Sequence, residues 1–257
     1  MAINAHRQTH VGIRDSTLRT WAFPQKMILD LTAFTTLAWV GFVVLVALIT
    51  AVADHFTPID NSAWESASRG IPWFTLIIGV RVGSKLLPVS IAHGKTRHAF
   101  TIETAIFLAI YSLAAALLTT LGWMLERAFF AATGWSQALN DTHLFATAHD
   151  YPEIFIESWL IVLAWTAAGV LISAAYYRFD ASGLIVIAPC LLISGVLQAA
   201  IGAGSTWGPL TPIVDRVFDP GSPSVVLAII TGLACIGLIL AMAWMVIRDI
   251  PMRSKTA

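Results

Sequence analysis

The sequence predicts an all-α, polytopic integral membrane protein with six transmembrane helices. Hydrophobic residues make up 57% of the 257 residues, charged residues only 12%, and the mean hydropathy is +0.77. A soluble domain usually carries about twice that charged fraction. The composition therefore excludes an ordinary soluble domain and a disordered chain. The net charge of zero gives no bulk basic field that would attract nucleic acid.

Six apolar segments are each about long enough to cross a hydrocarbon core of roughly 30 Å. They are Leu31–Val52, Ile71–Leu87, Ala105–Leu125, Ile154–Tyr176, Gly183–Gly204 and Val225–Ile247. Each should be a helix, because a helix satisfies its own backbone polar groups in lipid. A transmembrane barrel would need alternating segments of about 10 residues, and the continuous run Trp39–Ile49 does not alternate.

Lysine and arginine predict that both termini are cytoplasmic. Ten basic residues then fall on the inside, namely Arg7, Arg14, Arg19, Lys26, Lys95, Arg97, Arg178, Arg248, Arg253 and Lys255, against Arg69, Arg127 and Arg216 outside. This asymmetry indicates a multi-pass protein of the cell membrane that has both ends on the cytoplasmic side.

The chain is expected to have no soluble domain of its own. Residues 1–28 form a cytoplasmic or interfacial segment, residues 29–250 the transmembrane domain, and residues 251–257 a cytoplasmic tail. Between Ile13 and Lys26 the apolar residues could share one side of a helix and the basic residues could point to the headgroups, which suits a helix lying in the inner membrane interface. A disordered basic tail is the alternative.

The loop after the second span contains the most informative motif. Pro88 suits the first turn of a short helix, and Gly94 suits its end. A basic Lys-Thr-Arg-His cluster follows directly. The loop either only fixes the topology or carries a coupling helix, parallel to the membrane, that docks on a cytoplasmic partner. It is not a nucleotide-binding P-loop, because Val89 stands where the first glycine of that motif is needed.

The stretch formed by Gly94, Thr96, Arg97, His98 and Phe100 resembles the loop motif of the ABC-2 type permeases, the membrane subunits of ABC exporters. The family usually has a second arginine where His98 stands, which leaves the charge at this position open. The order of spans, the N-terminal segment and the long segment before the last span are also similar to the family.

The resemblance implies a permease subunit that moves a hydrophobic or amphipathic substrate by alternating access. It implies coupling to an ATP-binding subunit through Pro88, Ser90, His93, Gly94, Lys95, Thr96, Arg97, His98 and Phe100. The expected partners are that ATPase, a second permease chain in a homodimer or heterodimer, and membrane lipid, with no nucleic acid. No cofactor is expected in this chain, since ATP and Mg²⁺ would bind the partner subunit.

The segment Gln198–Asp219 mixes apolar residues with glycine and proline. Such a segment can break from the fifth span and re-enter the outer leaflet, provided that protein covers its backbone. Short capping helices at this position are what the family resemblance implies. An ordinary surface loop is the alternative.

Four polar residues in or near the spans are candidates for lining a transport pathway. Arg81 and Lys85 lie four residues apart and so share a helix face. They either reach the headgroups of the inner leaflet or form a basic vestibule. Glu157 and Gln198 are expected at similar depth near the outer surface, where a hydrogen bond between them would satisfy both.

No catalytic set is visible, so the chain is not expected to be an enzyme. The outer residues Asp141, His143, His149, Asp150 and Glu153 have metal-ligand types, but a flexible, solvated loop explains them better than a metal site. Two other functions stay open. One is a secondary transporter that needs no ATPase, and the other is a non-transport accessory or immunity protein of the membrane.

Overall fold

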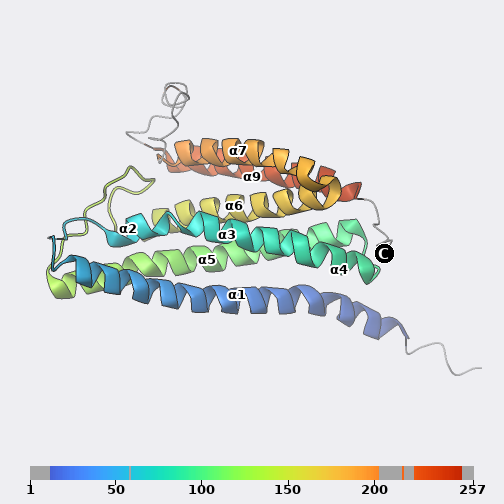
Figure 1. The fold of residues 1–257 in the computed structure, drawn as a ribbon, viewed down its shortest axis with the longest axis horizontal. Coiled ribbons are helices and arrows are strands. Elements are labelled where there is room, and N and C mark those ends of the chain that lie inside the picture. Colours follow the sequence, from blue (N-terminus) through green and yellow to red (C-terminus); the bar gives the residue numbers. More distant parts are fainter. Residues whose placement is uncertain (1–11, 58, 203–215, 217–222, 251–257) are drawn as a thin grey trace, which may run out of the picture.

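The structure, a computed structural model, describes residues 12–57, 59–202, 216 and 223–250. Helices run side by side along the long axis, and no strand occurs in these ranges apart from a single bridge between Asn61 and Ala138 (Figure 1). The α-helices are α1 (Gly12–Ala53), α2 (Ala63–Ser68), α3 (Ile71–Arg81), α4 (Leu87–Ala92), α5 (Arg97–Thr133), α6 (Tyr151–Phe179), α7 (Ile187–Ala200) and α9 (Val225–Arg248). A π-helical turn, η1 (Val82–Leu86), joins α3 to α4, and a 3₁₀ turn, η2 (Asp180–Val186), joins α6 to α7.

The bundle has two distinct ends. The end that we call the α4 end carries α4, η2, the start of α1 and the last turn of α9 (Figure 1). The opposite end, the α2 end, carries α2 and the loop 134–150 between α5 and α6. Both the first and the last described residues therefore lie at the α4 end.

Among the residues that the structure describes, five helical runs are long and apolar enough to cross a membrane. They are Leu29–Ala53, Ala63–Ala92, Arg97–Thr133, Tyr151–Ala200 and Val225–Arg248. The prediction of an all-α chain with several membrane-spanning helices is confirmed. The last span lies within one residue of its predicted bounds, whereas α5 extends the predicted third span at both ends.

The run Tyr151–Ala200 contains a reversal of direction. Its 50 residues would extend about 75 Å as one straight helix. The chain instead leaves α6 at Asp180, where φ is 54°, and α7 returns beside α6 and α9 (Figure 1). Gly183 permits the sharp return, because a Cβ there would lie 2.2 Å from the Ala175 carbonyl oxygen.

Two expected interfacial helices are continuous with spans. The predicted N-terminal helix is the first part of the 42-residue α1, with no break before the first span. The predicted coupling helix is likewise not a separate element parallel to the membrane, because α4 continues α3 through η1. The π-turn has a physical reason: Pro88 has no N–H to donate to the preceding turn, and the wider turn before it absorbs the lost bond.

The predicted re-entrant segment lies largely outside the described residues. Gln198, Ala199 and Ala200 belong to α7, and the described chain continues only to Gly202, at a φ of 90°. The expectation of a re-entrant segment stays a prediction.

Helix α6 is the centre of the bundle. Almost every residue from Val162 to Ala175 is buried, because α3, α5, α7 and α9 all pack against it. Lipid-facing surface is provided by the other helices. Most of the exposed large apolar side chains lie on α1, α5, α7 and α9.

The closest helix contact is between α3 and α6. A Cβ on Gly79 would lie 2.0 Å from the Thr166 carbonyl oxygen, and a Cβ on Gly169 would lie 2.2 Å from that of Leu76. Gly83 similarly faces Ser173. Small residues four apart permit close backbone approach in membrane helices, so the spacing of Gly169 and Ser173 marks a true contact.

We expect Gly169→Ala to destabilise the protein, because its methyl group would overlap the backbone of α3. Overpacking of this kind costs about 1–3 kcal/mol. Gly237→Ala is the matched control, since nothing lies within 4 Å of a Cβ at that position. Thermal unfolding of the purified variants in detergent should show a lower midpoint for Gly169→Ala only. Equal midpoints for the two variants would contradict the close contact.

Candidate functional site

The loop at the α4 end has a defined conformation. Helix α4 ends at Ala92 with His93 as its C-cap, and Gly94 adopts the left-handed conformation, with φ 76°. Thr96 then caps α5 by accepting a hydrogen bond from the amide of Ala99, at 3.1 Å. The predicted stop at Gly94 is thus confirmed, and the turn between α4 and α5 is tight.

Two basic side chains fasten this loop to neighbouring helices. The Lys95 ammonium donates to both carboxylate oxygens of Glu103 on α5, at 2.6 and 2.8 Å. The Arg97 guanidinium donates to the carbonyl oxygen of Ile250, at 2.5 Å. Ile250 follows α9, so Arg97 connects the loop to the end of the last span.

The carboxyl end of α9 receives a second arginine. Arg178, at the end of α6, donates to the carbonyl oxygens of Met245 and Val246, each at 3.2 Å. The last carbonyls of a helix lack partners within it, and they attract cations. The two arginines therefore tie α5 and α6 to the same end of α9.

The structure divides the predicted coupling residues into an exposed and a buried set. His93, Gly94, Thr96 and His98 are exposed, and Pro88, Lys95 and Arg97 are half-buried. Ser90 and Phe100 are buried, and Phe100 packs in a small core with Leu87 and Ile247. Arg97 and Phe100 thus hold the loop in place, while the two histidines form its accessible surface.

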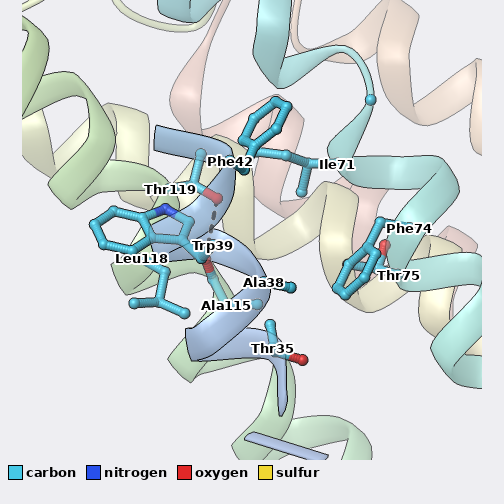
Figure 2. Close-up of a pocket in the computed structure, with 11 residues that line it drawn as sticks. Thr35, Ala38, Trp39, Phe42, Ile71, Phe74, Thr75, Ala115, Leu118 and Thr119 are labelled. Atoms are coloured by element: carbon cyan, nitrogen blue, oxygen red, sulfur yellow. Dashed lines mark hydrogen bonds between the residues drawn. The ribbon is translucent and has the colours of Figure 1, made fainter. Parts of the chain in front are cut away.

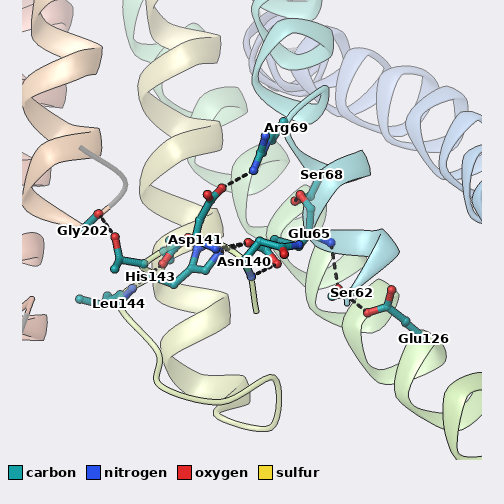
Figure 3. A network of polar contacts seen from close by, with 12 residues as sticks. Ser62, Glu65, Ser68, Arg69, Glu126, Asn140, Asp141, His143, Leu144 and Gly202 are labelled. Carbon is teal, nitrogen blue, oxygen red and sulfur yellow. Dashed lines mark hydrogen bonds and ion pairs between the residues drawn. The ribbon is translucent and has the colours of Figure 1, made fainter. Parts of the chain in front are cut away.

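At the α2 end, three buried glutamates form a polar network that the sequence did not predict (Figure 3). Glu65, Glu126 and Glu157 are only 1%, 8% and 7% exposed. Glu126 accepts hydrogen bonds from Ser62, from the amide of Trp64 and from Gln137, at 2.6–2.7 Å. This carboxylate attaches α2 to α5.

The other two glutamates hold the loop 134–150. Glu65 accepts from the amides of Asn140 and Asp141, at 2.8 and 2.7 Å. Glu157 accepts from the amide of Leu144 at 2.8 Å, and His143 lies 2.9 Å away. A buried amide that lost its acceptor would cost about 1–3 kcal/mol, so the loop is fixed on the bundle by these acids.

His143 lies between two of the glutamates. Its Nδ1 is 2.9 Å from Glu157, and its Nε2 is 3.5 Å from Glu65. Burial by itself would lower the pKa of His143, but its hydrogen bond to Glu157 and the charges of Glu157 and Glu65 together raise the pKa above the ordinary value. The His143 ring also stacks on the Phe145 ring, with centroids 4.5 Å apart. This contact favours the protonated form of His143.

A small cavity of about 60 Å³ adjoins His143 and Glu157 and is also lined by Trp123, Thr119 and Ser158. Its size suits one or two water molecules. A titratable histidine beside buried carboxylates and such a cavity can take up and release a proton.

Two expectations for this end were wrong, namely the pairing of Glu157 with Gln198 and the flexible, solvated loop. Both oxygens of Glu157 are occupied by His143 and Leu144, so Glu157 does not pair with Gln198. The loop is not a free, solvated segment, since Glu65 and Glu157 bind its amides and Thr142 binds the Gly202 carbonyl. Within the described ranges, no three histidine, cysteine or acidic side chains are placed to hold a metal ion.

One sequence signal could have revealed part of this network. Ser62 and Glu65 have the spacing of a helix capping box, and Ser62 does cap α2 by accepting from the Glu65 amide at 3.0 Å. The Glu65 carboxylate, however, reaches the loop instead of its own helix end. The partners of Glu126 and Glu157 come from distant segments, and no local pattern indicates them.

Arg81 and Lys85 are exposed at the boundary of α3 and η1. Gly79 and Gly83 face α6, so the two basic residues point away from the bundle. Neither makes an ion pair in the part of the chain that the structure describes. A charge facing hydrocarbon costs at least about 2.5 kcal/mol at the bilayer centre, so this face needs a polar or anionic neighbour.

An apolar pocket of about 230 Å³ lies between α1, α3 and α5 (Figure 2). Trp39, Phe42 and Phe74 surround it, and Thr35 and Thr119 add hydroxyl groups. The span of α1 is the least buried of these spans, because only 6% of its most apolar stretch is buried inside the bundle. The pocket therefore lies beside a loosely packed helix and suits an apolar group.

Comparison with protein-family models, with curated proteins and with solved structures found no match to this chain.

The raised pKa of His143 predicts that the attachment of the loop depends on pH. The stabilisation by the protonated histidine is fully present below its ordinary pKa of 6.5 and is lost as the pH rises through its higher pKa in the folded protein. We expect hydrogen exchange at the amides of Asn140, Asp141 and Leu144, corrected for intrinsic rates, to accelerate as the pH rises above 6.5 and through the higher pKa of His143 in the folded protein.

His143→Gln should remove this pH dependence. His149→Gln, on an exposed histidine of the same loop, should keep it. If the His143→Gln protein retained the same pH profile, His143 would not control the attachment.

Proposed function

We propose that this chain is the membrane-spanning permease subunit of an ATP-driven ABC exporter. The proposal joins the family resemblance of the loop to its geometry. The chain would perform no covalent chemistry, and ATP with Mg²⁺ would bind a separate subunit. Its work would be to bind substrate differently in two conformations.

The observation that carries the proposal is the mechanical connection of the loop at the α4 end. The loop joins α4 to α5 directly, Lys95 fixes it to Glu103, and Arg97 fixes it to Ile250 after α9. A partner that pushed on His93 and His98 would therefore move α3, α5 and α9 together. A coupling element needs such a rigid link to the helices. A loop that only fixes the topology does not need one.

We infer six crossings, with both termini in the cytoplasm. Here α6 is the fourth crossing and η2 with α7 is the fifth, since the run Tyr151–Ala200 reverses at Asp180. The α4 end would be cytoplasmic, because it carries Lys95, Arg97, Arg178 and Arg248. A bacterial inner membrane is the matching location, and two permease chains would enclose the pathway.

The pocket between α1 and α3 supports a hydrophobic or amphipathic substrate. It opens beside the span that is least held by the bundle, and apolar side chains dominate its lining. Ligand sites of this kind are mostly apolar with a few polar groups. The hydroxyl groups of Thr35 and Thr119 would be those groups here.

Affinity purification of the tagged chain from its native host in mild detergent, followed by mass spectrometry, tests the proposal. A stoichiometric ATP-binding subunit is expected. His93→Glu combined with His98→Glu should weaken its recovery at least about tenfold, whereas Arg127→Glu at the opposite end should not. Repeated recovery of the chain without any ATPase would overturn the proposal.

Arg97→Glu should uncouple the complex without preventing its assembly. The substitution breaks the bond to Ile250 and places an acid against the carbonyl end of α9, which repels it. We expect the nucleotide-dependent change in labelling of a reporter cysteine, Phe56→Cys at the exposed α2 end, to be lost. Arg248→Glu, a more exposed arginine at the same end of α9, is the matched control. A full labelling response in Arg97→Glu would exclude the link through Ile250.

A proton-coupled carrier that needs no ATPase is the second candidate. The observation in its favour is His143 between Glu65 and Glu157, beside a small cavity. Such a carrier would move protons through this network, and Glu157→Gln would abolish proton uptake by vesicles that hold the purified chain alone. An ABC permease would show no such uptake without its ATPase.

A further inference from the structure

We infer that the exposed face of α3 and η1 binds an anionic lipid of the inner leaflet, with the headgroup on Arg81 and Lys85. This inference depends on the membrane location of the chain and on the α4 end being cytoplasmic. It does not depend on ATP-driven transport.

The face has the polarity of a phospholipid along its length. Trp73, Ile77, Arg81, Lys85 and Val89 follow one another at steps of four residues, and all are exposed. Trp73 and Ile77 are 57% and 61% exposed and provide an apolar strip. The two cations follow toward the α4 end, so tail and headgroup would each meet a matching surface.

The depth of Arg81 and Lys85 suits a lipid headgroup that lies slightly inside the usual boundary of the hydrocarbon core. Gly79 lies against Thr166 and Gly83 against Ser173, which sets Arg81 beside the α4-end half of α6. Measured from Trp165, the middle of α6, Arg81 is about 7 Å toward that end. The hydrocarbon boundary is about 15 Å from the bilayer centre. Arg81 therefore lies inside this boundary and Lys85 close to it, within reach of a phosphate through their long side chains.

The length of the apolar strip fits one acyl chain. From Arg81 back to Trp73 is 8 residues, or about 12 Å of helix, against about 15 Å for half of the hydrocarbon core. Trp73 contacts Trp165 edge to face, with centroids 4.9 Å apart, which fixes the far end of the strip. A chain lying along Ile77 would end against this aromatic pair.

The local backbone holds this face outward. The glycine contacts of α3 with α6 leave no freedom for the helix to rotate. The π-turn η1 then places Ser84 and Lys85 on the exposed side together with Arg81. Among the described residues no acid pairs with either cation, so both are free to bind a phosphate group.

Binding of lipids to the purified full chain, measured by native mass spectrometry and by thermal unfolding in detergent, tests the inference. Phosphatidylglycerol should bind and raise the unfolding midpoint, and phosphatidylcholine should not. Arg81→Gln with Lys85→Gln should weaken phosphatidylglycerol binding about 30-fold, from the loss of two charges near the surface. Arg69→Gln with Arg127→Gln, which removes two charges at the α2 end, is the matched control and should leave it unchanged.

Three further measurements separate the possible occupants. Inorganic phosphate should not raise the unfolding midpoint, because it lacks the chain that would lie on Ile77, and Ile77→Ser should weaken lipid binding without removing the headgroup preference. If the double glutamine variant fails to purify, Lys85→Gln alone should shift binding in the same direction. Retained preference for phosphatidylglycerol, equal binding of inorganic phosphate, or efficient disulfide cross-linking of two Arg81→Cys chains would each overturn the inference.

Discussion

The contact between α3 and α6 is the constraint on which the rest of the structure depends. Gly79, Gly83 and Gly169 let the two helices approach until a single methyl group would collide with a backbone carbonyl at Gly79 or Gly169, or with the Ser173 hydroxyl at Gly83. In lipid no hydrophobic force draws helices together, so such close packing has to supply much of the association. The contact fixes the rotation of α3, and with it the outward direction of Arg81 and Lys85. It also buries α6, around which α5, α7 and α9 are arranged.

The two ends of the bundle are closed by different chemistry. At the α4 end, Arg97 and Arg178 donate to the carbonyls that α9 leaves without partners. At the α2 end, Glu65, Glu126 and Glu157 accept from amides that the loop and α2 leave without partners. In both cases an arginine or glutamate side chain satisfies backbone groups that would otherwise lack a partner within the protein. The basic end links three spans rigidly, and the acidic end holds a loop through a histidine that titrates.

The loop at the α4 end, the apolar pocket beside α1 and the basic face of α3 are separate surfaces of the bundle. A loop that is fixed to α5 and α9 can transmit a movement into the bundle. Helix α1 is held by the hydrogen bond between Thr35 and Tyr111 and by aromatic contacts, and an apolar pocket stays open beside it. The basic face of α3 lies on neither of these surfaces. Motion of the bundle, access from the membrane and binding of an anionic lipid are thus assigned to separate parts of the molecule.

Composition and apolar length were enough to predict an all-helical chain and most of its long apolar helices. Apolar length predicts the last span almost to the residue, and Gly94 predicts the end of α4, since each of these depends on a few neighbouring residues. Only the tertiary structure decided that Arg97 faces Ile250, that Glu157 binds His143 and not Gln198, and that α4 continues α3. The contacts of Arg97 and Glu157 depend on partners that are 14–153 residues away. The continuation of α3 into α4 depends on the π-turn that accommodates Pro88. Local periodicity indicates which residues are buried, but the choice of a partner for a buried charge is made by the packing of whole helices.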